Sequence, residues 1–171
     1  YQTARRHMVE SQVRPNDVTD PRIQDAMAET PREAFLPVEL RDQAYVEQEI
    51  AYAPGRWLLR ARDFAKLLAV AAPSEGDLVL NAVCGSGYST AILAQLVEMV
   101  VSIEDDESLA NEAQETLSSL DLNNAAVING DPQAGAEKQG PFDLIFLGGV
   151  IEKRPDVLLS QLKDGGRLAT I

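Results

Sequence analysis

The second part of the chain alternates between short apolar runs and longer segments in which apolar residues recur every three or four positions. Runs of the first kind predict strands that are covered on both faces, and the longer segments predict amphipathic helices. The predicted strands are residues 78–83, 99–103, 125–128, 142–147 and 167–171, and the predicted helices are residues 62–71, 88–96, 107–120 and 155–162. Such an alternation predicts an α/β fold with a mostly parallel sheet and right-handed crossovers.

The first 60 residues have helical spacing that is interrupted by several breakers. Asp20 and Pro21 form a helix-start signal, and this helix should stop before Pro31. We therefore predict two parts within one structural domain, a helical N-terminal arm over residues 1–60 and an α/β part over residues 61–171. The chain ends inside a predicted strand, so a further C-terminal portion is expected.

Composition and charge narrow the classes of function. The chain has 171 residues and a net charge of −12, which repels phosphate backbones and argues against a nucleic-acid partner. Cys84 is the one cysteine, so an intrachain disulfide is excluded and a cytoplasmic location is favoured. No apolar run approaches the ~20 residues that span a bilayer, which argues against a membrane partner. No cluster has metal-ligand spacing, so we expect no metal. The oligomeric state is left open.

Residues 78–90 are the most informative segment. An apolar run passes into a turn of small residues and then into a segment with helical spacing. This strand–turn–helix pattern is typical of the start of a nucleotide-binding, Rossmann-type unit. A turn without bulky side chains lets backbone N–H groups approach a ligand. The candidate ligand-binding residues of the turn are Cys84, Gly85, Ser86 and Gly87.

Acidic residues follow the second and third strands of this part. Glu104 comes 19 residues after Gly85, the spacing of an acid that accepts hydrogen bonds from ribose hydroxyls, and Asp105 beside it is a further candidate ligand-binding residue. The alternative is a solvated acidic helix start. Gly130 and Asp131 follow the third strand, where Asp131 would accept from an exocyclic amine such as that of adenine. The alternative there is an ordinary Asp-Pro turn.

The pattern excludes two phosphate-binding turns. A Walker loop needs Gly-Lys-Ser/Thr, which is absent, and a dinucleotide turn needs a third glycine where Thr90 stands. A pyrophosphate would also be repelled by the neighbouring carboxylates. A cofactor with a ribose and a cationic centre suits these residues better, and S-adenosylmethionine has both.

Several segments together resemble the protein-L-isoaspartate O-methyltransferase family. They are residues 18–27, 31–37 and 44–45 in the arm, and residues 85–91, 102–104, 129–131 and 141–145 in the α/β part. The resemblance implies a Rossmann-like class I methyltransferase fold, S-adenosylmethionine as methyl donor, and an isoaspartyl-containing protein or peptide as substrate for repair. It also implies that Gly85, Ser86, Gly87, Glu104 and Asp131 contact the cofactor.

The chain departs from the family's pattern at several positions. Asn81 and Val83 stand where the family has an acid and a first glycine, and Leu59 stands where it has a serine near the substrate. No catalytic residue is assigned, because a carboxylate substrate is already ionised at neutral pH. A basic cluster of Arg56, Arg60 and Arg62 is either a carboxylate-binding group or a solvated face.

Three hypotheses remain open at this point. The chain is an isoaspartyl methyltransferase, or a methyltransferase of the same fold with another substrate, or a non-catalytic descendant that binds a nucleoside or a protein partner. Leu59 and Val83 favour the second and third, whereas Gly85, Glu104 and Asp131 favour the first two.

Overall fold

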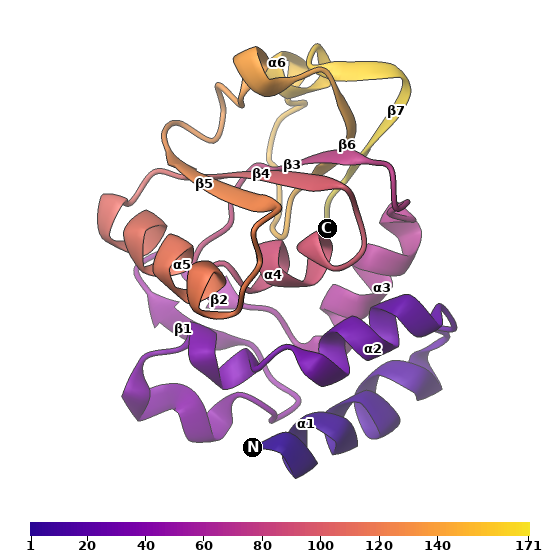
Figure 1. Ribbon diagram of the computed structural model, residues 1–171, viewed down its shortest axis with the longest axis vertical. Helices are drawn as coiled ribbons and strands as arrows, with labels where there is room; N and C mark the ends of the chain where they lie inside the picture. Colours follow the sequence, from indigo (N-terminus) through magenta and orange to yellow (C-terminus); the bar gives the residue numbers. More distant parts are fainter. The chain divides into compact units, whose positions relative to one another are not determined.

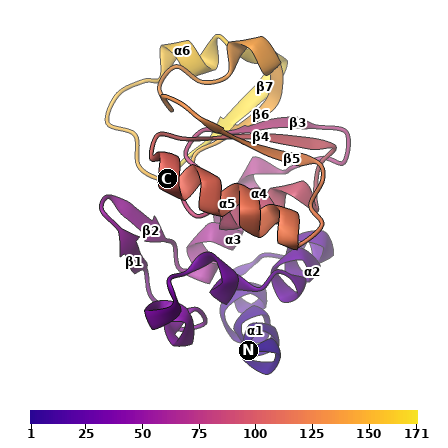
Figure 2. The same cartoon turned by 60° about the vertical axis from the view of Figure 1, so that its left-hand side comes forward.

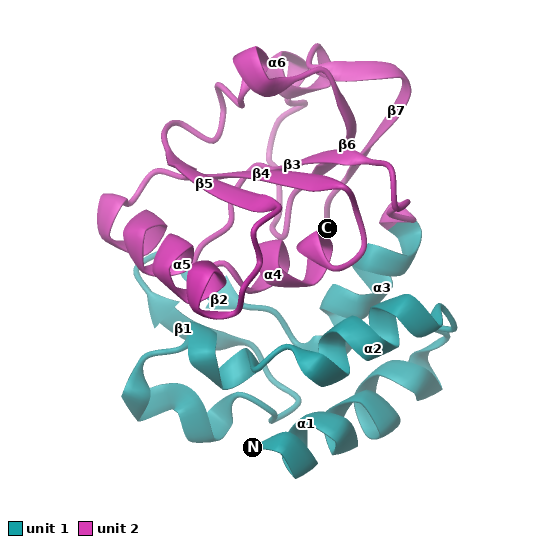
Figure 3. Ribbon diagram, in the orientation of Figure 1, with its two compact units in different colours: residues 1–70 teal, residues 71–171 magenta.

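The computed structural model describes residues 1–171 and divides them into two compact units. Residues 1–70 form unit 1 and residues 71–171 form unit 2 (Figure 3). The division after residue 60, between a helical arm and an α/β part, remains a prediction. None of the helices is long and apolar enough to cross a bilayer.

Unit 1 is mainly helical. Its first elements are α1 (Gln2–Met8), η1 (Val9–Val13), η2 (Arg14–Asn16), α2 (Pro21–Glu29), η3 (Arg32–Phe35) and η4 (Val38–Gln43). The helix-start signal is confirmed, because the Asp20 carboxylate accepts the Arg22 N–H at 2.9 Å and Pro21 begins α2. The helix ends at Glu29, before Pro31, as expected.

A hairpin and a helix complete unit 1. Strands β1 (Ile50–Ala53) and β2 (Arg56–Leu58) pair in antiparallel fashion around a tight turn, where Gly55 has a φ of 68°. Glycine adopts this left-handed conformation without the steric cost of a Cβ. Helix α3 (Ala61–Ala71) follows and runs across the boundary between the two units.

Unit 2 is built on a five-stranded sheet in the order β5-β4-β3-β6-β7, and every neighbouring pair is parallel. The elements are β3 (Leu78–Asn81), α4 (Tyr88–Ala94), β4 (Met99–Glu104), α5 (Glu107–Ser119), β5 (Ala125–Asn129), η5 (Glu137–Gln139), β6 (Phe142–Phe146), α6 (Asp156–Leu159) and β7 (Leu162–Ala169). Helices α4 and α5 cover one face of the sheet and α6 lies on the other (Figures 1 and 2). The predicted parallel α/β sheet flanked by helices is confirmed.

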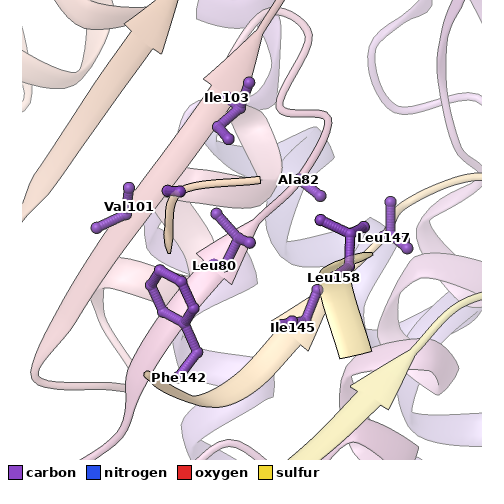
Figure 4. Close-up of a cluster of buried hydrophobic side chains, with 9 residues drawn as sticks. Leu80, Ala82, Val101, Ile103, Phe142, Ile145, Leu147 and Leu158 are labelled. Atoms are coloured by element: carbon purple, nitrogen blue, oxygen red, sulfur yellow. The ribbon is translucent and has the colours of Figure 1, made fainter. Parts of the chain in front are cut away.

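Along β3 and β4, apolar side chains point to one face of the sheet, and the side chains between them point to the other. Leu80 and Ala82 of the β3 segment, and Val101 and Ile103 of β4, join an apolar cluster that also contains Leu158 of α6 (Figure 4). Successive side chains of a strand point to opposite faces. The intervening positions of the same strands therefore lie on the face that carries α4 and α5, and several of them are polar.

The sequence-based prediction was wrong at the C-terminal end. The helix predicted over residues 155–162 is the single short helix α6, and the last strand begins at Leu162 rather than at Arg167. Gly165 and Gly166 are typical turn residues and favour a strand that begins after them, but both lie within β7. A register irregularity opposite Phe142–Leu144 accommodates them, with Gly165 at a φ of 79°.

Candidate ligand-binding edge of the sheet

The small residues after β3 form the tight turn that their sequence predicts. Gly85 has a φ of 54° and Gly87 a φ of 94°, both in the left-handed region that favours glycine. The Gly87 N–H donates to the Cys84 carbonyl at 2.9 Å, which closes the turn, and Gly87 then precedes α4. A Cβ at Gly87 would lie 3.1 Å from the Cβ of Ala113, so close packing by α5 also requires glycine there.

Glu104 ends β4 and is fully buried, with 0% of its surface exposed. Its Oε2 accepts the Gly85 N–H at 2.8 Å, and its Oε1 accepts the Asp106 N–H at 3.1 Å. The structure therefore joins the glycine turn directly to the acid that ends β4, a contact that the sequence did not predict.

The other predicted acidic residues lie at the same edge but face water. Asp105 and Asp131 are exposed, at the ends of the neighbouring strands β4 and β5. The Gly130 N–H donates to the Glu104 carbonyl at 3.0 Å, so the two strand ends are joined. Asp131 accepts the Gln133 N–H at 2.9 Å, which is the local contact expected of an Asp-Pro turn.

Three buried polar residues form a hydrogen-bonded group beneath the turn, which the sequence did not predict. Asn81, Thr90 and Ser102 are all fully buried between the sheet and α4. Asn81 Nδ2 donates to Ser89 Oγ at 2.8 Å and to Thr90 Oγ1 at 3.0 Å, and Thr90 Oγ1 lies 2.7 Å from Ser102 Oγ. The signal in the sequence was Ser102, a polar residue within the apolar run of β4.

Asn81 also carries a buried acceptor that has no partner, its Oδ1. An unpaired buried carbonyl has a free-energy cost, and such groups mark places where a ligand or water supplies the donor. Asn81 is the residue that replaces the family's acid. An amide and a carboxylate both offer acceptor oxygens, so the replacement retains acceptor capacity but not the charge.

Val83 stands where a glycine was expected to allow close approach. Its side chain is half-buried and packs against the apolar cluster that contains Leu80 and Leu158. The added isopropyl group is therefore accommodated by packing against this cluster.

In unit 1, Arg32 donates hydrogen bonds to the backbone next to and within the segment that replaces the family's serine region. This side chain is 1% exposed. Its Nε donates to the Ala44 carbonyl at 2.7 Å, and its terminal NH2 donates to the Leu59 carbonyl. The backbone of Leu59 is thus anchored although its side chain has no hydroxyl.

Two of the three arginines of the predicted basic cluster are ion-paired within unit 1. Arg60 lies 2.7 Å from Asp63, and Arg62 lies 3.3 Å from Glu47 and 3.1 Å from Asp63. A substrate carboxylate would have to compete with these acids for the guanidinium groups. The contacts favour the solvated-face interpretation of Arg60 and Arg62.

Within unit 1, the half-buried Tyr45 links α1 to η3. The Tyr45 hydroxyl donates to Glu33, and Arg5 Nε donates to Tyr45 at 3.1 Å. Burial and the hydrogen bond to Glu33 raise the pKa of Tyr45, so the phenol remains protonated and keeps donating throughout the neutral range.

Comparison with known proteins supplies a second, independent line of evidence. The profile of the family described as protein-L-isoaspartate(D-aspartate) O-methyltransferase matches residues 3–170. A protein-L-isoaspartate O-methyltransferase of Vibrio vulnificus is 38% identical over 153 residues, which cover 90% of this chain and 74% of that protein. One from Pseudoalteromonas atlantica is 40% identical over 146 residues, covering 84% of this chain and 69% of that protein.

The fold agrees with these relatives. The solved structure of a protein-L-isoaspartate O-methyltransferase superposes with a TM-score of 0.83 at 25% identity, and the match covers 95% of this chain. The chain spans 54% of the length of that solved protein. The match therefore includes both units of this chain.

Proposed function

Because the chain belongs to the protein-L-isoaspartate(D-aspartate) O-methyltransferase family, we propose that it methylates the free carboxyl group of isoaspartyl residues in damaged proteins. It is an S-adenosylmethionine-dependent O-methyltransferase by family and has the class I methyltransferase fold. The observation that carries this proposal is the family match over residues 3–170, which includes both units.

The cofactor would bind at the carboxyl edge of β3, β4 and β5. Parallel sheets bind ligands outside the carboxyl ends of their strands, and three features of this edge suit S-adenosylmethionine. They are the left-handed turn at Gly85 and Gly87, the exposed carboxylates of Asp105 and Asp131, and the unpaired buried oxygen of Asn81. The proposed cofactor-binding residues are Cys84, Gly85, Ser86, Gly87, Glu104, Asp105, Gly130 and Asp131.

Each group has a distinct task in this proposal. The turn of residues 84–87 offers backbone N–H groups, and Asp131 accepts from the adenine amine. Glu104 and Asp105 accept from the ribose hydroxyls. A carboxylate offers about four acceptor positions, and the hydrogen bonds from the Gly85 and Asp106 amides leave Glu104 with capacity for a diol.

The chemistry requires alignment more than proton transfer. When bound, S-adenosylmethionine supplies a methyl group on a sulfonium, ready for displacement by an oxygen nucleophile. The substrate carboxylate has an ordinary pKa of about 4 and is ionised at neutral pH, so no general base is needed. Holding the reacting groups in line can lower a barrier by about 7–11 kcal/mol. The task of this chain is therefore to bind and orient, and no residue is assigned a catalytic proton.

The substrate and location follow the same reasoning. A net charge of −12 supports a protein rather than a nucleic acid as substrate. A single cysteine, Cys84, supports a cytoplasmic location, where thiols are kept reduced.

A methyl-transfer assay tests the proposal directly. Labelled S-adenosylmethionine is incubated with the chain and an isoaspartyl peptide, and the matched control is the same peptide with a normal aspartyl residue. We expect base-labile methyl incorporation into the first peptide only. Calorimetric titration with S-adenosylhomocysteine is run in parallel. Binding without transfer to either peptide would support a different substrate, and absence of both would support a non-catalytic descendant.

The replacement of the family's serine by Leu59 has its own test. A lost hydrogen bond to a charged substrate group costs about 1.5–3 kcal/mol, so Leu59→Ser should raise the rate roughly 10- to 150-fold. Leu59→Ala is the matched control, because it removes the same side chain without adding a hydroxyl. Equal methyl-transfer rates in the two variants would show that residue 59 does not contribute to substrate binding.

A further inference from the structure

Glu104 differs from the other acids at the ligand-binding edge in where its carboxylate is directed. Asp105 and Asp131 are exposed, whereas Glu104 is fully buried. It follows Ile103 in β4, so alternation along the strand puts its side chain on the face opposite the apolar cluster of Ile103 and Leu158. Both of its oxygens bond to main-chain N–H groups, those of Gly85 at 2.8 Å and Asp106 at 3.1 Å. An acid that served only to meet a ligand would be expected to lie open to that ligand.

The two amides belong to loops that follow neighbouring strands. Gly85 lies in the turn between β3 and α4, and Asp106 precedes α5. Asp106 in turn caps α5, since its side chain accepts the Leu109 N–H at 3.1 Å. One carboxylate therefore joins the glycine turn to the beginning of α5. The main chain of Glu104 adds β5, because its carbonyl accepts the Gly130 N–H at 3.0 Å.

We propose that Glu104 is a positioning residue that holds the glycine turn in its ligand-binding shape before any ligand arrives. This role is additional to the ribose contact of the proposed function, and only the identity of the ligand rests on that function. The physical reason is that a buried N–H needs an acceptor, and one ionised carboxylate supplies acceptors to both amides through charge-assisted hydrogen bonds. In a neutral Gln side chain one of these two acceptor oxygens is replaced by an NH2 donor, which cannot accept from a main-chain N–H.

Ligand-free protein provides the test, because a ribose contact cannot contribute there. Amide hydrogen exchange is measured by NMR for wild type and Glu104→Gln. We expect the Gly85 or the Asp106 amide to exchange at least tenfold faster in the variant, and the Tm to fall by roughly 5–12 °C. The amides of Ala82 and Leu147, which bond to carbonyls of β6 and β7, should stay protected.

Two further variants keep the test specific. Glu115→Gln makes the same substitution at an exposed position of α5 and should change neither exchange nor Tm. Glu104→Asp keeps the charge on a shorter side chain and should restore part of the protection. If Glu104→Gln does not fold, the exchange measurement is made on Glu104→Asp, where faster exchange at Gly85 or Asp106 supports the role.

Titration with S-adenosylhomocysteine separates this inference from the proposed function. If Glu104→Gln keeps wild-type exchange and Tm while its affinity falls tenfold or more, the positioning role is overturned and the ribose role stands. If wild type binds no S-adenosylhomocysteine but Glu104→Gln still exchanges faster at Gly85, the positioning role stands and the proposed cofactor site fails.

Discussion

Each unit contains one fully buried charged side chain that bonds to main-chain groups. Arg32 of unit 1 is 1% exposed and donates to the carbonyls of Ala44 and Leu59. Glu104 of unit 2 is 0% exposed and accepts from the amides of Gly85 and Asp106. Arg32 therefore donates to carbonyl groups in the arm, whereas Glu104 accepts from amide groups just before α4 and α5.

The difference follows from the main-chain groups that each region leaves without partners. The beginning of a helix has spare N–H groups, so an anion is the matching side chain beside α5. The irregular segments of unit 1 leave carbonyls at residues 44 and 59, and a guanidinium offers several donors in one plane. The sign of a buried charge can thus be understood from the backbone that surrounds it.

The largest expected effect is at Arg32. Arg32→Met removes the donors from two carbonyls and should lower the free energy of unfolding by about 3–5 kcal/mol. Urea unfolding followed by circular dichroism measures it. Arg14→Met is the control, because its ion pair with Glu10 is exposed on both sides and should contribute at most about 0.5 kcal/mol. Similar losses in the two variants would show that burial of the arginine is unimportant.

Gly87→Ala tests whether the turn in unit 2 depends on backbone conformation as well as on Glu104. A φ of 94° and a contact at 3.1 Å from Ala113 both oppose a Cβ. We expect a loss of about 1–3 kcal/mol and weaker binding of S-adenosylhomocysteine by calorimetry. Gly76→Ala is the control, since a Cβ there meets nothing within 4 Å. An unchanged affinity of Gly87→Ala for S-adenosylhomocysteine would show that the turn is not part of the cofactor site.

Thr90→Val asks whether neutral polar groups beneath the turn matter as much as the charged one. The substitution preserves shape but removes the hydroxyl that contacts Asn81 and Ser102. Loss of these hydrogen bonds should lower the free energy of unfolding by about 1–2 kcal/mol. Thr116→Val is the control, because the half-buried Thr116 donates its hydroxyl only one turn back along α5, to the Glu112 carbonyl at 2.9 Å. An effect as large as that of Glu104→Gln would contradict a special role for charge.

The smallest effect concerns an exposed ion pair at the opposite edge of the sheet, Lys163–Asp143 at 2.7 Å. Burial raises the pKa of Asp143, but hydrogen bonds from Lys163 and the Leu78 N–H outweigh it and hold that pKa below its ordinary value. The stabilisation is therefore complete above the unfolded pKa of about 3.9 and is lost as pH falls through the lower folded value.

Lys163→Met should raise the pKa of Asp143 towards its ordinary value. At neutral pH the variant should lose less than about 1 kcal/mol, and the two proteins should converge in acid, where the carboxyl is protonated in both. NMR titration of the Asp143 carboxyl and unfolding at two pH values measure this. A loss that persisted in acid would mean that Lys163 contributes by packing instead.

Sequence pattern alone anticipated most of unit 2. The strands β3, β4, β5 and β6 were predicted to within one or two residues, because buried parallel strands are continuous apolar runs. The glycine turn was also predicted, since Gly85 and Gly87 are residues whose local conformational freedom is visible in the sequence. The error at β7 came from interpreting Gly165 as a turn, when a strand irregularity accommodates it.

The sequence by itself therefore determined where strands, helices and the turn lie, because these depend on residues that are neighbours along the chain. Tertiary structure decided what the polar side chains do. Glu104 reaches Gly85 across 19 residues and Arg32 reaches Leu59 across 27. Whether such a side chain faces water or the backbone depends on which segments pack around it, and no local pattern encodes that.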